Sequence, residues 1–170
     1  MTRNQRVRRI AILCCHCARN VAYYRAGWNR KRLVKNEDFW VSANGNFLDL
    51  AVLEWCKLFT DRRGKHYWNK VVPESVDFLS DLHAQLRVDA CGFEAHCNEM
   101  KVYRDKFIAH LDDELVMHIP KLTLAINSVI YLYAVVRAEY SELLPDAPTN
   151  LRQFYRERYS HGRVIYGKAT

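Results

Sequence analysis

The chain has 170 residues, of which 49% are apolar and 26% charged, so it is long enough to bury a sizeable core in one packed domain. This composition excludes an intrinsically disordered chain, and no apolar run approaches the roughly 18 residues of a membrane span. The net charge of +7 favours anionic partners. We predict a soluble protein with a single domain over residues 1–170.

The positive charge is concentrated at the N-terminus. Residues 1–35 contain ten Arg and Lys and no acid, whereas the remaining residues sum to −3. Such a segment attracts polyanions whatever their sequence, which makes Arg6, Arg8 and Arg9 candidate RNA contacts. A solvated helix face has the same pattern. The basic start resembles a secretory signal, but His16 ends the apolar run after six residues, so we predict a cytoplasmic protein.

Helical periodicity is continuous from the first residues. Apolar positions three or four residues apart predict a strongly basic first helix over residues 1–35. Its seam consists of Ile10, Cys14, Cys17, Val21, Tyr24 and Trp28. Cys14 and Cys17 form a Cys-x-x-Cys spacing, but neither a second ligand pair nor a strand-to-helix setting accompanies them. We therefore expect the cysteines to be free thiols, most of them buried in the core.

Further helices follow in the same manner. We predict a second helix over about 37–60, a turn at 61–64, a third helix from Pro73-Glu74, a fourth after Asp89 and a fifth from Pro120 to Leu143. The prolines at 145 and 148 end the fifth helix, and a C-terminal extension over 145–170 carries a short helix at 151–158. The fold class is therefore all-α, an antiparallel bundle of four to five long helices with a short C-terminal helix.

One residue of the fourth helix does not fit its apolar stripe. The stripe Phe93, Cys97, Met100, position 104, Phe107, Leu111 places Arg104 among apolar residues. A buried guanidinium is costly unless it is paired or faces a cleft. Asp105 is one possible partner, a bound phosphate is another, and carboxylates of neighbouring helices (Asp49, Glu54, Asp77) are further ones.

His110 follows six residues after Arg104. On a regular helix this step rotates the side chain by about 240°, so the two would not converge within one helix. Either the helix ends near His110, or a second subunit completes the site. Arginine and histidine together suit phosphodiester chemistry, because the imidazole moves a proton and the guanidinium stabilises charge on the phosphoryl oxygens.

The string Arg104-Asp-Lys-Phe-Ile-Ala-His110, on a long helix of a small bundle, resembles the Arg-x5-His signature of the HEPN superfamily, and in particular its abortive-infection AbiU-type branch. The resemblance implies a homodimeric, metal-independent endoribonuclease without cofactors, with a composite cleft in which Arg104 and His110 promote attack of a ribose 2′-hydroxyl on the adjacent phosphate. Asp105 would orient one of them. It also implies a role in toxin–antitoxin or phage-defence systems, with a cognate antitoxin or a nucleotidyltransferase as partner.

Other residues are accessory candidates. Tyr103 shares the flank of His110 and either holds the imidazole or packs in the core. The cations and aromatics at 55–59 and 64–68 are of the kind that contact RNA, although Trp55 and Phe59 suit the core and His66 alone is an accessory site residue. No histidine spacing predicts a metal site, and no Gly-rich phosphate loop is present.

Two alternatives to a ribonuclease remain open. The first is a non-catalytic HEPN-like dimer that binds a partner, a nucleotide or RNA and keeps Arg104 and His110 for its architecture. The second is an electrostatic nucleic-acid binder that depends on residues 1–35.

Overall fold

The computed structural model describes residues 1–109 and 118–167. These residues form six α-helices and one two-stranded hairpin, which confirms the all-α fold class. The α-helices are α1 (Arg3–Ala26), α2 (Asp38–Phe59), α3 (Phe78–Leu86), α4 (Ala90–Tyr103), α5 (Leu122–Glu139) and α6 (Leu151–Ile165). Strands β1 (Trp28–Asn29) and β2 (Arg32–Leu33) pair antiparallel, with Trp28 opposite Leu33. Short 3-10 turns occupy η1 (Trp68–Lys70) and η3 (Ser141–Leu143).

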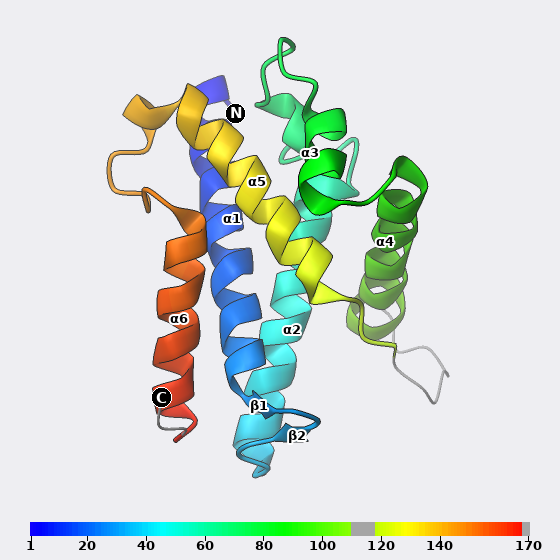
Figure 1. The fold of residues 1–170 in the computed structure, drawn as a ribbon, viewed down its shortest axis with the longest axis vertical. Helices are drawn as coiled ribbons and strands as arrows, with labels where there is room; N and C mark the ends of the chain where they lie inside the picture. The colour runs from blue at the N-terminus through cyan, green and yellow to red at the C-terminus, as the bar shows by residue number, and fades with distance from the viewer. Residues whose placement is uncertain (110–117, 168–170) are drawn as a thin grey trace.

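Helix α1 lies at the centre of the bundle (Figure 1). It packs between α2 on one side and α6 on the other, and α5 crosses in front of it. Helix α4 packs on the outer side of α2, and the hairpin lies at the end of the molecule where α1 finishes and α2 begins. The C-terminal extension is thus part of the bundle, because α6 runs along α1.

The predicted seam of α1 forms the centre of the core. Ile10, Cys14, Cys17 and Val21 are fully buried, and the neighbouring helices contribute Val52, Trp55, Leu58, Met100, Val129, Leu132 and Val136. All six cysteines are free, and four of them (Cys14, Cys17, Cys56 and Cys97) are buried. Burial raises the pKa of the Cys14 and Cys17 thiols well above the ordinary value, so the Cys-x-x-Cys spacing serves packing rather than redox chemistry.

The first element is not one helix over 1–35. Helix α1 ends at Ala26, and the chain turns at Arg30 and Lys31 into the hairpin. Trp28 therefore lies on β1, not on the helix seam, and its indole Nε1 donates to Asn44 Oδ1 at 2.9 Å. A strand of two residues has too little alternation to be read from sequence.

The predicted third helix begins later than Pro73. Helix α3 starts at Phe78, and the Asp77 carboxylate caps it by accepting from the backbone N–H of Ser80. An Asp cap satisfies one of the otherwise unpaired N–H groups of the first turn, which favours this start over the proline.

Helices five and six also differ from prediction. Helix α5 covers Leu122–Glu139 and not Pro120–Leu143, because Tyr140 leaves the helical conformation and η3 follows. The Tyr140 hydroxyl donates to the carbonyl of Val71 at 2.9 Å, which fixes this end. The terminal helix extends to Ile165 and not to Arg158, because its C-terminal turns pack on α1.

Helix α5 is long and apolar enough to cross a membrane by length and composition. It packs against α1, α3 and α6, and its buried residues include Ala125, Val129 and Leu132. This is the placement of a core helix of the bundle.

Candidate functional site

The predicted Arg104 motif coincides with a change of helix type. Helix α4 ends at Tyr103, and the chain continues as a six-residue π-helix, η2 (Arg104–Ala109). π-Helical turns are rare and occur frequently at functional sites. His110, the second predicted catalytic residue, lies outside the described residues.

Two carboxylates hold the Arg104 guanidinium. Its Nε donates to Asp105 Oδ1 and its Nη1 donates to Asp61 Oδ1, both at 2.7 Å. The Arg104 side chain is 21% exposed, so it lies at the edge of the bundle and not inside it. The hydrogen bond that Arg104 donates to Asp105, helped by the one that it donates to Asp61, outweighs partial burial and raises the pKa of Arg104 above its ordinary value.

Asp105 is therefore a partner of Arg104, which confirms one of the partners that we considered from the sequence. The second partner, Asp61, was not predicted. It lies in the turn that follows α2, where nothing in the sequence marks it as a partner of α4. Glu54 instead accepts from Asn20, and Asp77 caps α3, so neither is the partner of Arg104.

Tyr103 points to α2 and not to the Arg104 ion pairs. Its hydroxyl donates to Asp49 Oδ1 at 2.8 Å, and the residue is buried. Burial, together with the Asp49 hydrogen bond, raises the pKa of Tyr103 above its ordinary value, so the phenol is a donor at neutral pH. The contact fixes the last turn of α4 before the π-helix begins.

A polar hollow adjoins Arg104. It measures about 630 Å³ and lies between the turn after α2 and α4. Asp61 is shared between this hollow and the Arg104 ion pair, and Arg63 and Lys101 supply positive charge. The two carboxylates around Arg104 are thus accompanied by cations that can face an anionic substrate.

The basic residues predicted to bind RNA separate into two places. Arg9 lines a hollow of about 350 Å³ together with Lys65 and His66. Burial lowers the pKa of His66, and the positive charges of Arg9, Lys57, Arg6 and Lys65 lower it further. The structure therefore brings Arg6, Arg9 and His66 together, whereas the contacts of Arg104 do not include His66.

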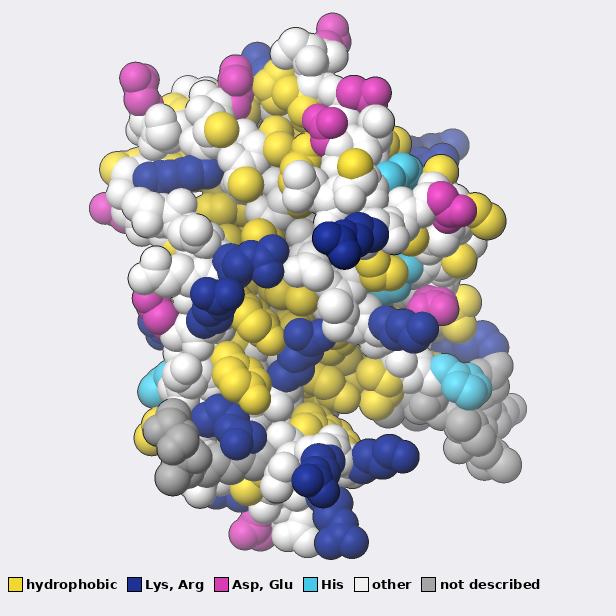
Figure 2. All heavy atoms as spheres, in the orientation of Figure 1, with side chains coloured by type: hydrophobic (Ala, Val, Ile, Leu, Met, Phe, Trp, Pro, Cys, Tyr) yellow, Lys and Arg dark blue, Asp and Glu magenta, His cyan; other side chains and the backbone are white. Residues whose placement is uncertain are grey.

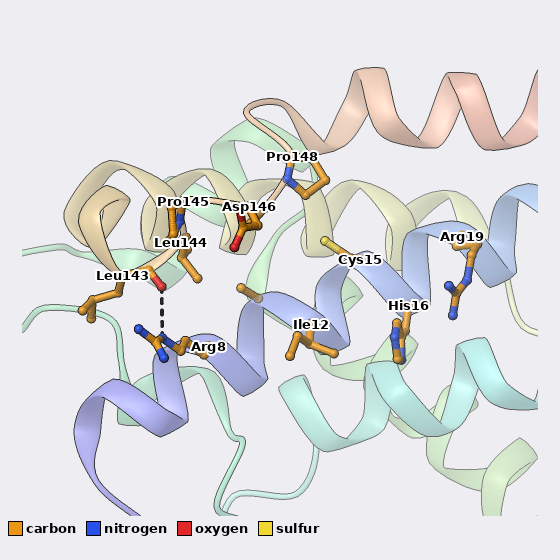
Figure 3. Close-up of a pocket in the computed structure, with 12 residues that line it drawn as sticks. Arg8, Ile12, Cys15, His16, Arg19, Leu143, Leu144, Pro145, Asp146 and Pro148 are labelled. Carbon is orange, nitrogen blue, oxygen red and sulfur yellow. Dashed lines mark hydrogen bonds between the residues drawn. The ribbon is translucent and has the colours of Figure 1, made fainter.

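Arg8 belongs to a different surface (Figure 3). Its Nε donates to the carbonyl of Leu143 at 3.2 Å, which fastens α1 to the segment after α5. It borders a hollow of about 490 Å³ between α1 and residues 143–148, into which the Cys15 thiol points toward Pro148. Burial raises the pKa of Cys15 to about 11, so this thiol is a poor nucleophile at neutral pH.

Within residues 1–109 and 118–167, no group of three or more His, Cys, Asp or Glu side chains is arranged to hold a metal ion. Comparison with protein-family models, with curated proteins and with solved structures finds no match to this chain.

Proposed function

We propose that this chain is an endoribonuclease of the HEPN type, which acts as a cytoplasmic homodimer in a toxin–antitoxin or phage-defence system. The observation that carries the proposal is the position of Arg104. The residue that the motif resemblance assigns to catalysis is the first residue of a π-helical segment, at the protein surface, with its guanidinium held by Asp61 and Asp105.

The proposed reaction needs two groups. The ribose 2′-oxygen attacks the adjacent phosphorus as its proton is removed, a 2′,3′-cyclic phosphate forms, and the bond from phosphorus to the 5′-oxygen breaks as that oxygen gains a proton. His110 moves these protons, and Arg104 stabilises the charge on the non-bridging oxygens. The two aspartate contacts use Nε and Nη1, and neither involves Nη2, so this amino group is the donor we assign to the phosphate.

Asp61 and Asp105 act as positioning residues in this scheme. Each accepts a charge-assisted hydrogen bond, which fixes the plane of the guanidinium before substrate binds. Preorganised donors stabilise developing charge without reorganisation during the reaction. Arg63 and Lys101, beside Asp61 in the adjoining hollow, attract the phosphate backbone.

The first experiment is cleavage of a mixed single-stranded RNA in EDTA by the wild type, Arg104→Ala and His110→Ala. Both variants are expected to lose about 100-fold or more of the cleavage rate, since each removes a group that acts in the transition state. Arg87→Asn, at the exposed arginine that follows the last residue of α3, serves as the control and is expected to cleave normally. Circular dichroism checks that every variant is folded.

Asp61→Asn separates positioning from chemistry. It keeps the size of the side chain and removes the negative charge that faces the Arg104 guanidinium. We expect kcat to fall while KM changes little, and the rate to retain its dependence on pH in the neutral range. Folded wild type that leaves every RNA intact would contradict the ribonuclease proposal.

One observation favours a second function. Two carboxylates already neutralise Arg104, as in a structural ion pair. The corresponding proposal is a non-catalytic dimeric module that binds RNA or a nucleotide. RNA binding without cleavage by the wild type, unchanged in Arg104→Ala, would support this module over the enzyme.

A further inference from the structure

A fourth hollow lies at the hairpin end of the molecule. It measures about 450 Å³ and opens between the last turn of α1, the hairpin turn and the residue that precedes Pro120. The described residues that line it are two aromatics, three cations and one aliphatic: Tyr24, Trp28, Arg25, Arg30, Lys31 and Ile119. No acid is among these six.

Helix α2 holds the Trp28 ring and the backbone of Tyr24 in place. The ring centroids of Tyr24 and Trp28 lie 6.0 Å apart, with the planes inclined at 57°. Asn44, which is buried, accepts from Trp28 Nε1 at 2.9 Å and donates from Nδ2 to the Tyr24 carbonyl at 3.0 Å. The aromatic wall of the hollow is therefore formed before any ligand binds.

The cations are placed at the rim. Arg30 and Lys31 are the exposed turn residues of the hairpin. Arg25 is fixed from two helices, because its Nη1 donates to the Tyr155 hydroxyl at 3.2 Å and its Nη2 to Thr123 Oγ1 at 2.9 Å. Dark-blue side chains gather over the half of the molecule that contains the hairpin and α6 (Figure 2).

Helix α2 links the hollow to the proposed catalytic motif. Its Asn44 donates to the Tyr24 carbonyl, and its Asp49 accepts from the Tyr103 hydroxyl. Tyr103 immediately precedes Arg104, so one helix holds both the hollow and the start of the motif.

We infer that this hollow binds one nucleotide of a single-stranded RNA, with the base against Trp28 and Tyr24 and the flanking phosphates at Arg30 and Lys31. The inference rests on the proposed function and names the element that holds its substrate. Single-strand binders combine aromatic platforms with a positively charged groove, because every base has a face that stacks and every linkage carries a charge. A duplex hides those faces within its own stack, so the same hollow discriminates against it.

The contribution of Arg30 to RNA binding is tested by comparing Arg30→Asn with the same substitution at Arg87. The probe is a fluorescein-labelled 2′-O-methyl oligouridylate of eight nucleotides, and binding is measured by fluorescence anisotropy at several salt concentrations. Arg30→Asn is expected to weaken binding about threefold or more at low salt and to reduce the salt slope by about 0.7, the value of one phosphate contact on a single strand.

Arg87→Asn is the matched control. Arg87 is also exposed and also left-handed, with φ 53° against 54° for Arg30, so asparagine suits both positions equally. It lies at the end of α3, toward the opposite end of the molecule from the hairpin. Equal binding by the two variants would overturn the assignment of the phosphates to Arg30.

The stacking contribution is tested with the base itself. Wild type is expected to bind the oligouridylate about five- to a hundredfold more tightly than an abasic oligomer of the same length and charge. Trp28→Leu abolishes most of this preference and Trp28→Phe retains part of it. Equal affinity of wild type for both oligomers, or for a duplex, would overturn the stacking site even if Trp28→Leu fails to fold.

The probe lacks a free 2′-hydroxyl, so the protein cannot cleave it by the proposed reaction. If wild type binds the probe through Arg30 and Trp28 but leaves unmodified RNA intact, the ribonuclease proposal fails and the binding site stands. If unmodified RNA is cleaved and both hairpin variants bind as wild type does, the binding site fails and the ribonuclease proposal stands.

Discussion

Glu54 is a buried carboxyl group in the interface between α1 and α2. It is only 8% exposed, its Oε2 accepts from Asn20 Nδ2 at 3.0 Å, and its Oε1 lies 3.3 Å from His16 Nδ1. Burial raises the pKa of Glu54 from its ordinary value of 4.5 to about 7, and the hydrogen bond from Asn20 only partly opposes this. Burial also lowers the pKa of His16, so the imidazole is largely neutral at pH 7.

The raised pKa gives a prediction for stability. Below about pH 4.5 Glu54 is protonated in both folded and unfolded chains, whereas above pH 7 the folded protein holds a buried carboxylate. The stability that comes from the raised pKa of Glu54 is therefore fully present at low pH and is lost as the pH rises through 7. Relative to Glu54→Gln, the wild type should lose about 1–3 kcal/mol of unfolding free energy between pH 5 and pH 8.

Urea unfolding of both proteins at several pH values measures this difference. The glutamine keeps an acceptor for Asn20 and does not titrate, so the subtraction removes the contribution of other histidines and thiols. A difference that stays constant from pH 5 to pH 8 would show that Glu54 titrates near its ordinary value.

At the scale of the elements, the closeness of α1 and α6 depends on one glycine. A Cβ at Gly162 would lie 2.7 Å from the Cβ of Ala26 and 3.0 Å from Cδ1 of Tyr23. The Ala26 atom is fixed to the backbone of α1, so it cannot move aside alone. Gly162 is therefore required for the approach of the two helices rather than for backbone freedom.

Gly162→Ala should destabilise the protein by about 1–3 kcal/mol, despite the better helix propensity of alanine, because the two helices must separate. Gly45→Ala, an exposed position of α2 with no atom within 4 Å of the added Cβ, should instead stabilise it by about 0.5–1 kcal/mol. Thermal and urea unfolding of the two variants measure both changes in stability. Stabilisation by both substitutions would contradict the close packing of α6.

For the molecule as a whole, the proposed function implies a second copy of the chain. Each chain carries one Arg104 and one His110, and the resemblance to HEPN proteins implies that both pairs would lie in one composite cleft. We therefore predict a particle of twice the chain mass of 20.1 kDa in solution at micromolar concentration, measured by light scattering. A monomer that cleaves RNA would contradict the composite cleft.

Mixing inactive subunits tests the cleft directly. Arg104→Ala and His110→Ala chains, unfolded together and refolded, form mixed dimers that hold one intact arginine and one intact histidine. A composite cleft should regain part of the cleavage activity that each variant lacks alone. No regain from dimers that demonstrably mix would place each site within one chain.

How far the sequence predicted this molecule differs from element to element. The α1 seam at Ile10, Cys14, Cys17 and Val21 was correct, and the predicted second helix at 37–60 matches Asp38–Phe59. These features follow from the local spacing of apolar residues, which can be recognised without knowing which helices pack together. Asp105 was also predicted as a partner of Arg104, because it is the next residue in the chain.

The remaining features depend on contacts between segments that are distant in the sequence. The pairing of Arg104 with Asp61, the end of α5 at Tyr140 and the aromatic hollow around Trp28 each require two or more elements to be placed together. The all-α class, most of the helices and the Arg104 motif could be predicted because the local spacing of residues encodes them. Packing between elements, which no local pattern encodes, sets which charges pair, where α4 becomes π-helical and where the aromatic hollow around Trp28 lies.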